Sequence, residues 1–222
     1  MNDRSKADPK ERIGEIISIL RSIYPNAKCS LNFATCHELM VAAILAAQCT
    51  DERVNQITPG LFAKYPTIAA FANADYNELE EIVKPTGFFR NKTKAIIESA
   101  RQIISEYNGV VPKSIDELVK LNGVGRKTAN LIVGVCYGQP AVIVDTHVTR
   151  ISQRLGFTKE KDPAKIERDL RMILPEDDQT MFNHLIVSHG RETCKAPTPR
   201  CEVCMLIELC PFGQARMSPK LL

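Results

Sequence analysis

Apolar residues recur at helical spacing along almost the whole chain, and this pattern constrains the fold more than any other feature. Residues 13–23 repeat them with a period of 3.6, which places them on one face of a helix. Residues 37–48 form a nearly continuous apolar segment whose length is typical of a buried helix. Only residues 141–144 have the composition of a strand, and one short strand cannot build a sheet. The sequence therefore predicts an all-α fold of roughly ten helices.

Capping residues mark where several of these helices begin and end. Asp and Ser followed three residues later by Glu form capping boxes, and Gly after a helical pattern is typical of a helix end. The expected starts are Asp8-Pro9 with Glu11, Asp75 with Glu78, Ser114 with Glu117, and Asp162-Pro163. Further helices are expected over residues 91–107, 125–137 and 178–188, of which the first two end before Asn108-Gly109 and at Gly138. We expect the polar start, Met1 to Ala7, and the last residues, Ser218 to Leu222, to be loose.

Composition limits the class of protein without identifying it. With 222 residues and 44% hydrophobic content, the chain can bury one or two cores. A net charge of +3 is only weak evidence for nucleic acid, because many enzymes share it. No apolar run is long enough to span a membrane, and the first residues lack the apolar core of a signal peptide. We therefore expect an intracellular, cytoplasmic protein without a membrane partner, whose eight cysteines are ligands or buried thiols rather than disulfides.

The segment Leu121-Asn-Gly-Val-Gly-Arg-Lys-Thr-Ala-Asn130 predicts a tight turn that opens a helix. Glycines at 123 and 125 permit positive φ and close approach of the backbone. The N–H groups at the start of the following helix can bind a phosphate of any nucleotide sequence. With residues 114–121 as the preceding helix, the motif is a helix–hairpin–helix. The glycines alone are equally compatible with a helix corner that binds nothing.

Lys127 and Asp145 are the candidate catalytic residues. Lys127 falls in the first turn of the predicted helix, where a cation is unfavourable, and a neutral lysine amine is a nucleophile that can form a Schiff base. Asp145, in Val144-Asp-Thr-His-Val-Thr-Arg150, could take the ammonium proton and stabilise a cationic sugar. The alternatives are a solvated surface lysine and a helix N-cap aspartate. We interpret His147 as a local hydrogen-bonding residue and Arg150 as structural or phosphate-facing.

Four cysteines near the C-terminus have the spacing C-x6-C-x2-C-x5-C: Cys194, Cys201, Cys204 and Cys210. So many thiolates in so short a segment indicate a metal site, and four sulfur ligands suit either zinc or an iron–sulfur cluster. Closing the first interval around a metal would form a stiff loop that presents Lys195 and Arg200, near Arg191, to phosphates; ordinary surface charge is the alternative. The remaining cysteines, Cys29, Cys36, Cys49 and Cys136, are interpreted as scattered packed thiols.

Four features in this order resemble the endonuclease III family of the helix–hairpin–helix superfamily, and the resemblance spans nearly the whole chain. They are Leu45-Ala-Ala-Gln-Cys-Thr-Asp51, the segment 121–130, Val144-Asp-Thr-His147 and the cysteine array. The resemblance implies two helical domains that flank a DNA cleft. Residues 29–139 would form a six-helix barrel with the helix–hairpin–helix. Residues 1–28 and 140–222 would form a domain holding a [4Fe–4S] cluster.

The resemblance also assigns roles to residues. Lys127 would be the nucleophile, Asp145 its acid partner, Gln48 the residue that fills the gap left by an everted nucleotide, and the four cysteines the ligands of the cluster. The segment Thr86-Gly-Phe-Phe-Arg90 falls where the family has an intercalating side chain, usually aliphatic, so Phe88 or Phe89 would take that role or belong to the core. Contacts to the DNA backbone would come from Gly123, Gly125, Arg126, Arg191, Lys195 and Arg200, although the loop 195–200 is less basic at its centre than in the family.

The implied activity is that of a bifunctional DNA glycosylase and abasic-site lyase. It would remove oxidised pyrimidines such as thymine glycol from double-stranded DNA and cut the strand by β-elimination, acting as a monomer associated with the nucleoid of a prokaryote. Two other classes stay open: a monofunctional mismatch glycosylase on the same scaffold, and a non-catalytic DNA-binding module whose cluster senses redox state. The adenine-mismatch branch has a glutamate where residues 41–47 of this chain contain no acid, and it lacks the lysine.

Overall fold

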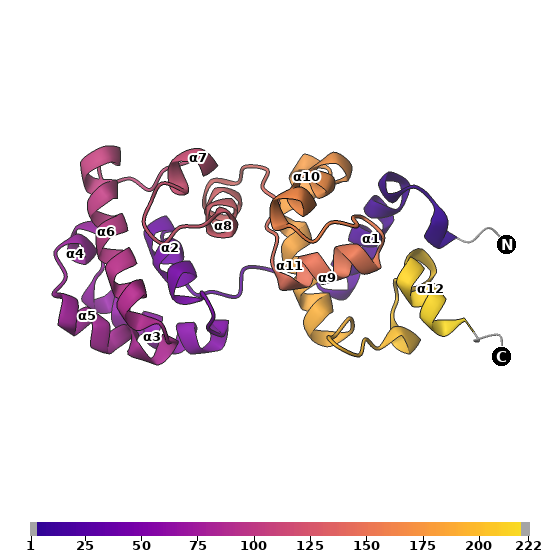
Figure 1. Ribbon diagram of the computed structural model, residues 1–222, viewed down its shortest axis with the longest axis horizontal. Helices are drawn as coiled ribbons and strands as arrows, with labels where there is room; N and C mark the ends of the chain where they lie inside the picture. The colour runs from indigo at the N-terminus through magenta and orange to yellow at the C-terminus, as the bar shows by residue number, and fades with distance from the viewer. Residues whose placement is uncertain (1–3, 219–222) are drawn as a thin grey trace. The chain divides into compact units, whose positions relative to one another are not determined.

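The computed structural model describes residues 4–218, and in them it contains helices and no strand (Figure 1). The predicted all-α fold is confirmed for this part of the chain. Residues Arg4–Lys6 form a short 3-10 helix, η1, with Ser5 buried, so the prediction of a loose start is wrong from residue 4 onward. The prediction is also wrong for Ser218, which is the C-cap of the final helix and donates its backbone N–H to the Gln214 carbonyl. The other residues expected to be loose, 1–3 and 219–222, lie outside the described residues. Among the described helices, none is long and apolar enough to cross a membrane.

The chain divides into two compact units, which are described separately. The central unit comprises Cys29–Gln139, and the terminal unit comprises Met1–Lys28 together with Pro140–Leu222. The terminal unit is thus built from both ends of the chain. In Figure 1 the indigo helix α1 (Pro9–Ile23) lies among the orange and yellow helices, and it packs against α10 and α11.

The central unit is built around the long helix α6 (Phe89–Tyr107), which contacts α2, α4 and α5. The other helices of the unit are α2 (Cys36–Leu45), α3 (Asp51–Lys64), α4 (Ile68–Ala72), α5 (Tyr76–Val83), the 3-10 helix η2 (Lys84–Thr86), α7 (Ile115–Leu118) and α8 (Arg126–Tyr137). Helix α2 is apolar on nearly every face because it lies between α3, α6 and α8. The predicted helix 37–48 is therefore present, but it ends three residues earlier than expected.

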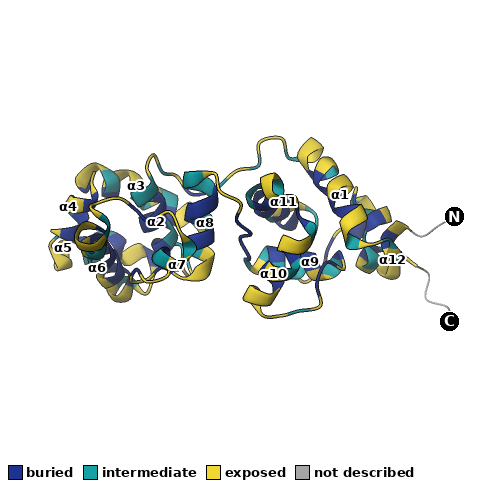
Figure 2. Ribbon diagram, turned by 90° about the horizontal axis from the view of Figure 1, so that it is seen from above, coloured by how far each residue is buried: buried dark blue, intermediate teal, exposed yellow. Residues whose placement is uncertain are grey.

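The terminal unit has its own hydrophobic core, formed by α1 and the helices after residue 140. These are α9 (Thr146–Arg154), α10 (Pro163–Ile173), η3 (Glu176–Asp178), α11 (Gln179–Glu192), η4 (Cys201–Val203), η5 (Ile207–Leu209) and α12 (Pro211–Met217). The apolar face of α1, with Ile13, Ile16, Ile17 and Leu20, belongs to this core. The faces of α1 turned away from it are exposed in Figure 2.

Residues 141–144 have the composition of a strand because they are buried, not because they pair with a strand. All four side chains are buried, Val142 and Val144 belong to the core of the terminal unit, and side chains of α11 hold the backbone of this segment. Thr180 Oγ1 donates to the Ala141 carbonyl at 3.3 Å, and Asn183 Nδ2 donates to the Ile143 carbonyl at 3.1 Å. These bonds satisfy buried carbonyls that a sheet would otherwise have to satisfy.

The predicted helix starts are confirmed where an N-cap side chain was identified. Asp8, Asp75, Ser114 and Asp162 each accept a hydrogen bond from a backbone N–H of the first turn of their helix. Helix boundaries elsewhere differ by a few residues, as for α6, which begins at Phe89 rather than at 91.

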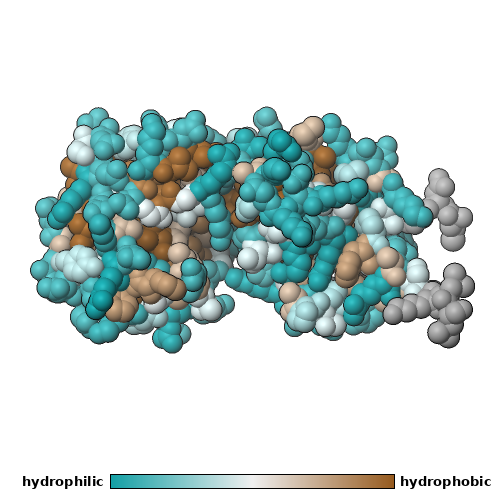
Figure 3. Space-filling view, in the orientation of Figure 1, coloured by the Kyte–Doolittle hydropathy of each residue, from teal (hydrophilic) through white to brown (hydrophobic). Residues whose placement is uncertain are grey.

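Hydrophilic side chains cover most of the surface in view in Figure 3.

Candidate functional site

The predicted hairpin lies between α7 and α8 in the central unit, and its two glycines have different roles. Gly123 has φ +76°, and a Cβ built on it would lie 2.6 Å from Cβ of Ala95 in α6. Gly125 has φ −87° and no atom within 4 Å of such a Cβ. The expectation of positive φ is therefore correct for Gly123 and wrong for Gly125. Gly125 instead leaves open space beside the backbone at the helix start.

Replacing Gly123 by alanine should destabilise the protein by about 1–3 kcal/mol, because the new Cβ meets Ala95 and the residue must keep a left-handed backbone. Urea unfolding measures this change. Gly60→Ala is the matched control, since Gly60 lies within α3 and has open space around it. There, alanine should raise the free energy of unfolding by up to about 1 kcal/mol. Equal effects of the two substitutions would contradict the close approach at Gly123.

Polar contacts fix the hairpin to α6. The backbone N–H of Asn122 donates to Oε1 of Gln102 at 2.9 Å, and Nε2 of Gln102 donates to the Lys120 carbonyl at 3.4 Å. The Asn122 side chain also donates to the carboxylate of Glu98. Helix α6 thus holds the segment just before Gly123 in place.

Helix α8 begins without the usual side-chain cap. In most α-helices among the described residues the N-cap side chain accepts a backbone N–H, but Gly125 has no side chain to do so. The first two helical residues are Arg126 and Lys127, and the first turn has no acidic residue. Two cations and uncapped N–H groups at a helix N-terminus favour binding of an anion.

Lys127 is exposed at this helix start in the free protein, as the alternative of a solvated surface lysine predicted. The thiol of Cys29 lies near it in the same unit. Burial raises the pKa of Cys29, and the positive charge of Lys127 acts in the opposite direction. The hairpin and the first turn of α8 thus bring together four predicted site residues of the central unit: Gly123, Gly125, Arg126 and Lys127.

Asp145 is the N-cap of α9 in the terminal unit, as the structural alternative predicted. Its Oδ1 accepts the backbone N–H of Val148 at 2.7 Å, and its Oδ2 lies 3.4 Å from Nδ1 of His147. The Asp145 side chain is 15% exposed. His147 is thus a local partner of Asp145, and Arg150 is structural, since its Nη2 donates to the Cys194 carbonyl at 3.1 Å.

Gln48 and Phe88, the two predicted insertion residues, both stand in left-handed backbone at exposed loop positions of the central unit. Their φ values are +53° and +47°, and apart from these two only Asn108, a helix C-cap, has positive φ among the described non-glycine residues. Phe88 is 62% exposed, whereas Phe89 is partly buried at the start of α6. Of the two phenylalanines, Phe88 is therefore the one free to contact a ligand.

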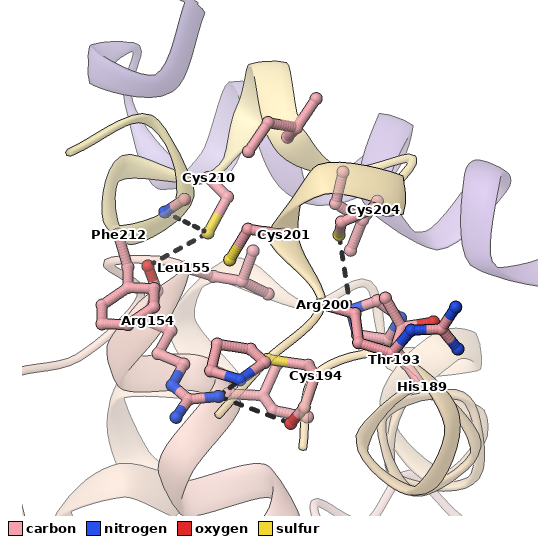
Figure 4. Close-up of a pocket in the computed structure, with 15 residues that line it drawn as sticks. Arg154, Leu155, His189, Thr193, Cys194, Arg200, Cys201, Cys204, Cys210 and Phe212 are labelled. Atoms are coloured by element: carbon pink, nitrogen blue, oxygen red, sulfur yellow. Dashed lines mark hydrogen bonds between the residues drawn. The ribbon is translucent and has the colours of Figure 1, made fainter. Parts of the chain in front are cut away.

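The four cysteines of the array line one pocket of the terminal unit, although they are separated along the chain (Figure 4). The pocket contains about 370 Å³ of space outside protein atoms, part of it open to solvent. Among the described residues, no three His, Cys, Asp or Glu side chains converge closely enough to hold a single metal ion. The thiols thus surround a space instead of meeting at a point, as Figure 4 shows.

Several N–H groups point at the sulfur atoms. Nη1 of Arg154 lies 3.2 Å from Sγ of Cys194, and the backbone N–H of Gly213 lies 3.3 Å from Sγ of Cys210. Burial, with a smaller contribution from the neighbouring cysteines, raises the pKa of the Cys204 thiol to about 11, although a hydrogen bond from the backbone of Leu206 acts in the opposite direction. Donors directed at sulfur favour the thiolate form that binds metal.

The sequence did not predict the role of Arg154 in the cysteine pocket. Arg154 also donates to the carbonyls of Cys194 at 3.4 Å and Lys195 at 3.0 Å, and its guanidinium lies 4.9 Å from the centre of the Phe212 ring. No motif marks it, because its partners lie about 40 residues further along the chain. Arg154 therefore holds the loop after Cys194.

The three predicted basic residues near the array are exposed on the terminal unit: Arg191 lies in the last turn of α11, and Lys195 and Arg200 lie in the loop that follows. The backbone N–H of Arg200 closes this loop by donating to the Thr193 carbonyl at 2.9 Å.

Cys36 and Cys136, expected to be scattered, are in fact neighbours. Burial raises the pKa of the Cys136 thiol, and a hydrogen bond with Cys36 raises it further. Cys29 also lies near this pair. All four of these cysteines, Cys49 included, are only partly buried.

Comparison with known proteins identifies the family. A model of the HhH-GPD superfamily of base excision DNA repair proteins matches residues 41–176. Endonuclease III of Synechocystis sp. is 50% identical over 96% of this chain and 97% of its own length, and endonuclease III of Bacillus subtilis is 45% identical over 87% and 89%. The structure of a trapped endonuclease III–DNA covalent intermediate superposes with a TM-score of 0.88 at 40% identity, covering 94% of this chain and 99% of that one. The chain belongs to the endonuclease III family within the HhH-GPD superfamily of base excision DNA repair proteins.

Proposed function

We propose that this member of a DNA glycosylase and abasic-site lyase family removes oxidised pyrimidines, such as thymine glycol, from double-stranded DNA and then cuts the strand 3′ to the abasic site. The observation that carries the proposal is the uncapped start of α8, which presents Lys127 behind the Gly123–Gly125 hairpin. The match to a solved covalent intermediate of an endonuclease III with DNA supports covalent chemistry by a residue in this fold.

Lys127 would be the nucleophile. Its amine lone pair forms a bond to C1′ of the everted nucleotide while the glycosidic bond breaks, and the departing base takes up a proton. The sugar ring then opens: the C1′–O4′ bond breaks, O4′ takes up a proton, and the nitrogen lone pair forms the C=N bond of a protonated imine. This imine acidifies the hydrogens on C2′. Loss of one of them as a proton expels the 3′ phosphate by β-elimination. Asp145 would accept the proton that the Lys127 ammonium must lose and stabilise positive charge on the sugar.

The hairpin would hold the DNA backbone beside the lesion. Open space at Gly125 lets a phosphate approach the N–H groups of α8, and Arg126 adds a second positive charge there. Gln48 would fill the gap left by the everted nucleotide, and Phe88 would enter the base stack beside it. Arg191, Lys195 and Arg200 would contact phosphates from the terminal unit.

The cysteine pocket fits a [4Fe–4S] cluster held by Cys194, Cys201, Cys204 and Cys210. Four thiols around an extended space suit a cluster of several ions better than zinc, whose four sulfur ligands lie about 2.3 Å from one ion. The cluster would cross-link the loop 194–210 and so hold Lys195 and Arg200 in place. On this proposal the terminal unit is the cluster domain, and the central unit is a six-helix barrel with the helix–hairpin–helix.

Replacing Asp145 by asparagine should separate its two roles. Asparagine caps helices as well as aspartate does, so the free energy of unfolding should change little. Loss of the carboxylate should lower the single-turnover rate of base release by about a hundredfold or more. Asp145→Ala is the comparison, since it should lose the rate and also about 1 kcal/mol of stability. A fully active Asp145→Asn variant would show that Asp145 acts only as the N-cap of α9 and has no catalytic role.

An assay that follows base release and strand cutting separately on one duplex tests the proposed function. A duplex carrying thymine glycol should lose the base and be cut at that site, with the protein acting as a monomer. Base release without cutting would indicate a monofunctional glycosylase. Binding without either reaction, on this and on other damaged bases, would indicate a non-catalytic DNA-binding module.

A further inference from the structure

The two insertion residues of the central unit stand on separate loops that share one unusual feature. Gln48 follows the end of α2, Phe88 follows η2, and each holds a left-handed backbone that a side chain of this size rarely adopts. Such a conformation persists only where the surrounding structure holds the backbone in place. Contacts within the free protein must therefore fix the backbone of both loops before any DNA is bound.

Lys92, in the first turns of α6, contacts both loops with one ammonium group. Its Nζ donates to the Leu45 carbonyl at 2.8 Å and to the Thr86 carbonyl at 2.8 Å. Leu45 is the last residue of α2, three residues before Gln48, and Thr86 is two residues before Phe88. The backbone N–H of Lys92 donates in addition to the carbonyl of Phe88 itself at 3.2 Å.

The surroundings of Lys92 are those of a structural cation, not of a surface lysine. The residue is 5% exposed, and in the described part of the chain no carboxylate forms an ion pair with it. Its partners are carbonyls at the ends of two helical segments, where a positive charge also interacts favourably with the helix dipole. Hydrogen bonds from a buried ammonium are charge-assisted and therefore strong. Burial lowers the pKa of Lys92.

We propose that Lys92 is a positioning residue that sets the spacing and backbone conformation of the Gln48 and Phe88 loops, so that both side chains enter the base stack together. This inference rests on the proposed function, because it assumes that the two side chains insert into DNA. Insertion of two side chains at neighbouring positions of one base stack requires accurate placement of both, and placing them in the free protein avoids the entropy cost of ordering the loops on binding.

The test is Lys92→Met, which keeps the length of the side chain and removes its donors. Lys94→Met is the matched control, because Lys94 lies on the same helix, is exposed and pairs only loosely with Glu98 at 3.8 Å. We expect Lys92→Met to lower the single-turnover rate of base release from duplex by at least tenfold and to reduce the fluorescence change of 2-aminopurine placed beside the lesion. Cutting of single-stranded DNA with a preformed abasic site, which needs no insertion, should change less than twofold.

A double-mutant cycle then shows whether Lys92 acts through the two loops. In a Gln48→Ala, Phe88→Ala background, Lys92→Met should have little further effect on base release. Equal losses on duplex and single-stranded substrates, or additive losses in the cycle, would overturn the proposal and leave Lys92 with a general role in stability. If Lys92→Met does not fold, Lys92→Gln, whose amide can still donate, is put through the same cycle. An inactive wild type would instead contradict the proposed function.

Discussion

Lys127→Ala abolishes strand cutting and base release while the protein still binds duplex DNA. We expect the single-turnover rate to fall by at least about a thousandfold, because no other group replaces an enzyme's nucleophile efficiently. Lys127 is exposed at the start of α8, so its replacement should not lower the melting temperature. DNA affinity should fall only slightly, since the N–H groups of α8 and Arg126 remain in place.

Lys120→Ala is the control for loss of positive charge near the hairpin. Lys120 precedes the turn, is exposed, and contacts Gln102 only through its backbone carbonyl. Its replacement should leave the rate within about twofold and weaken binding modestly at low salt. A Lys127→Ala variant that still cuts DNA at a rate similar to Lys120→Ala would show that the nucleophile lies elsewhere.

Cys201→Ser removes one proposed ligand of the cluster and should destabilise the terminal unit. Cys201 is buried in the pocket with the other three cysteines. We expect the purified protein to lose bound iron and sulfide. It should also lose about 3 kcal/mol of stability, which lowers the melting temperature of a chain of this size by about 6–12 °C.

Cys49→Ser controls for the loss of a thiol as such, because Cys49 lies in the central unit and does not line the pocket. Its iron content should equal that of the wild type. Zinc in place of iron in the freshly purified wild type, or full iron content in Cys201→Ser, would contradict the proposed cluster.

Local signals in the sequence predicted the helices and the parts of the site that lie close together along the chain. Asp75, Ser114 and Asp162 mark helix starts because the capping bond is made within three residues. The hairpin of α7 and α8 was predicted for the same reason. The different roles of its glycines were not, since the close approach at Gly123 depends on Ala95 in another helix.

The remaining features depend on contacts between residues far apart along the chain. The apolar segment 37–48 has no residue that ends a helix, yet α2 ends at Leu45, whose carbonyl binds Lys92 from α6. Arg154 likewise gains its role only when the loop after Cys194 folds back onto α9. Residues 141–144 resemble a strand because burial selects the same side chains in either structure. Tertiary contacts decided each of these cases, and periodicity cannot show them.

Borohydride trapping on a duplex with thymine glycol, with wild type and Lys127→Ala side by side, shows whether Lys127 forms an imine with the sugar. Borohydride reduces an imine to a stable amine and so preserves any covalent link between protein and sugar. If Lys127 is the nucleophile, the wild type forms a covalent protein–DNA complex and Lys127→Ala forms none. Base release by the wild type without a trapped complex would contradict the lysine mechanism and indicate attack by water instead.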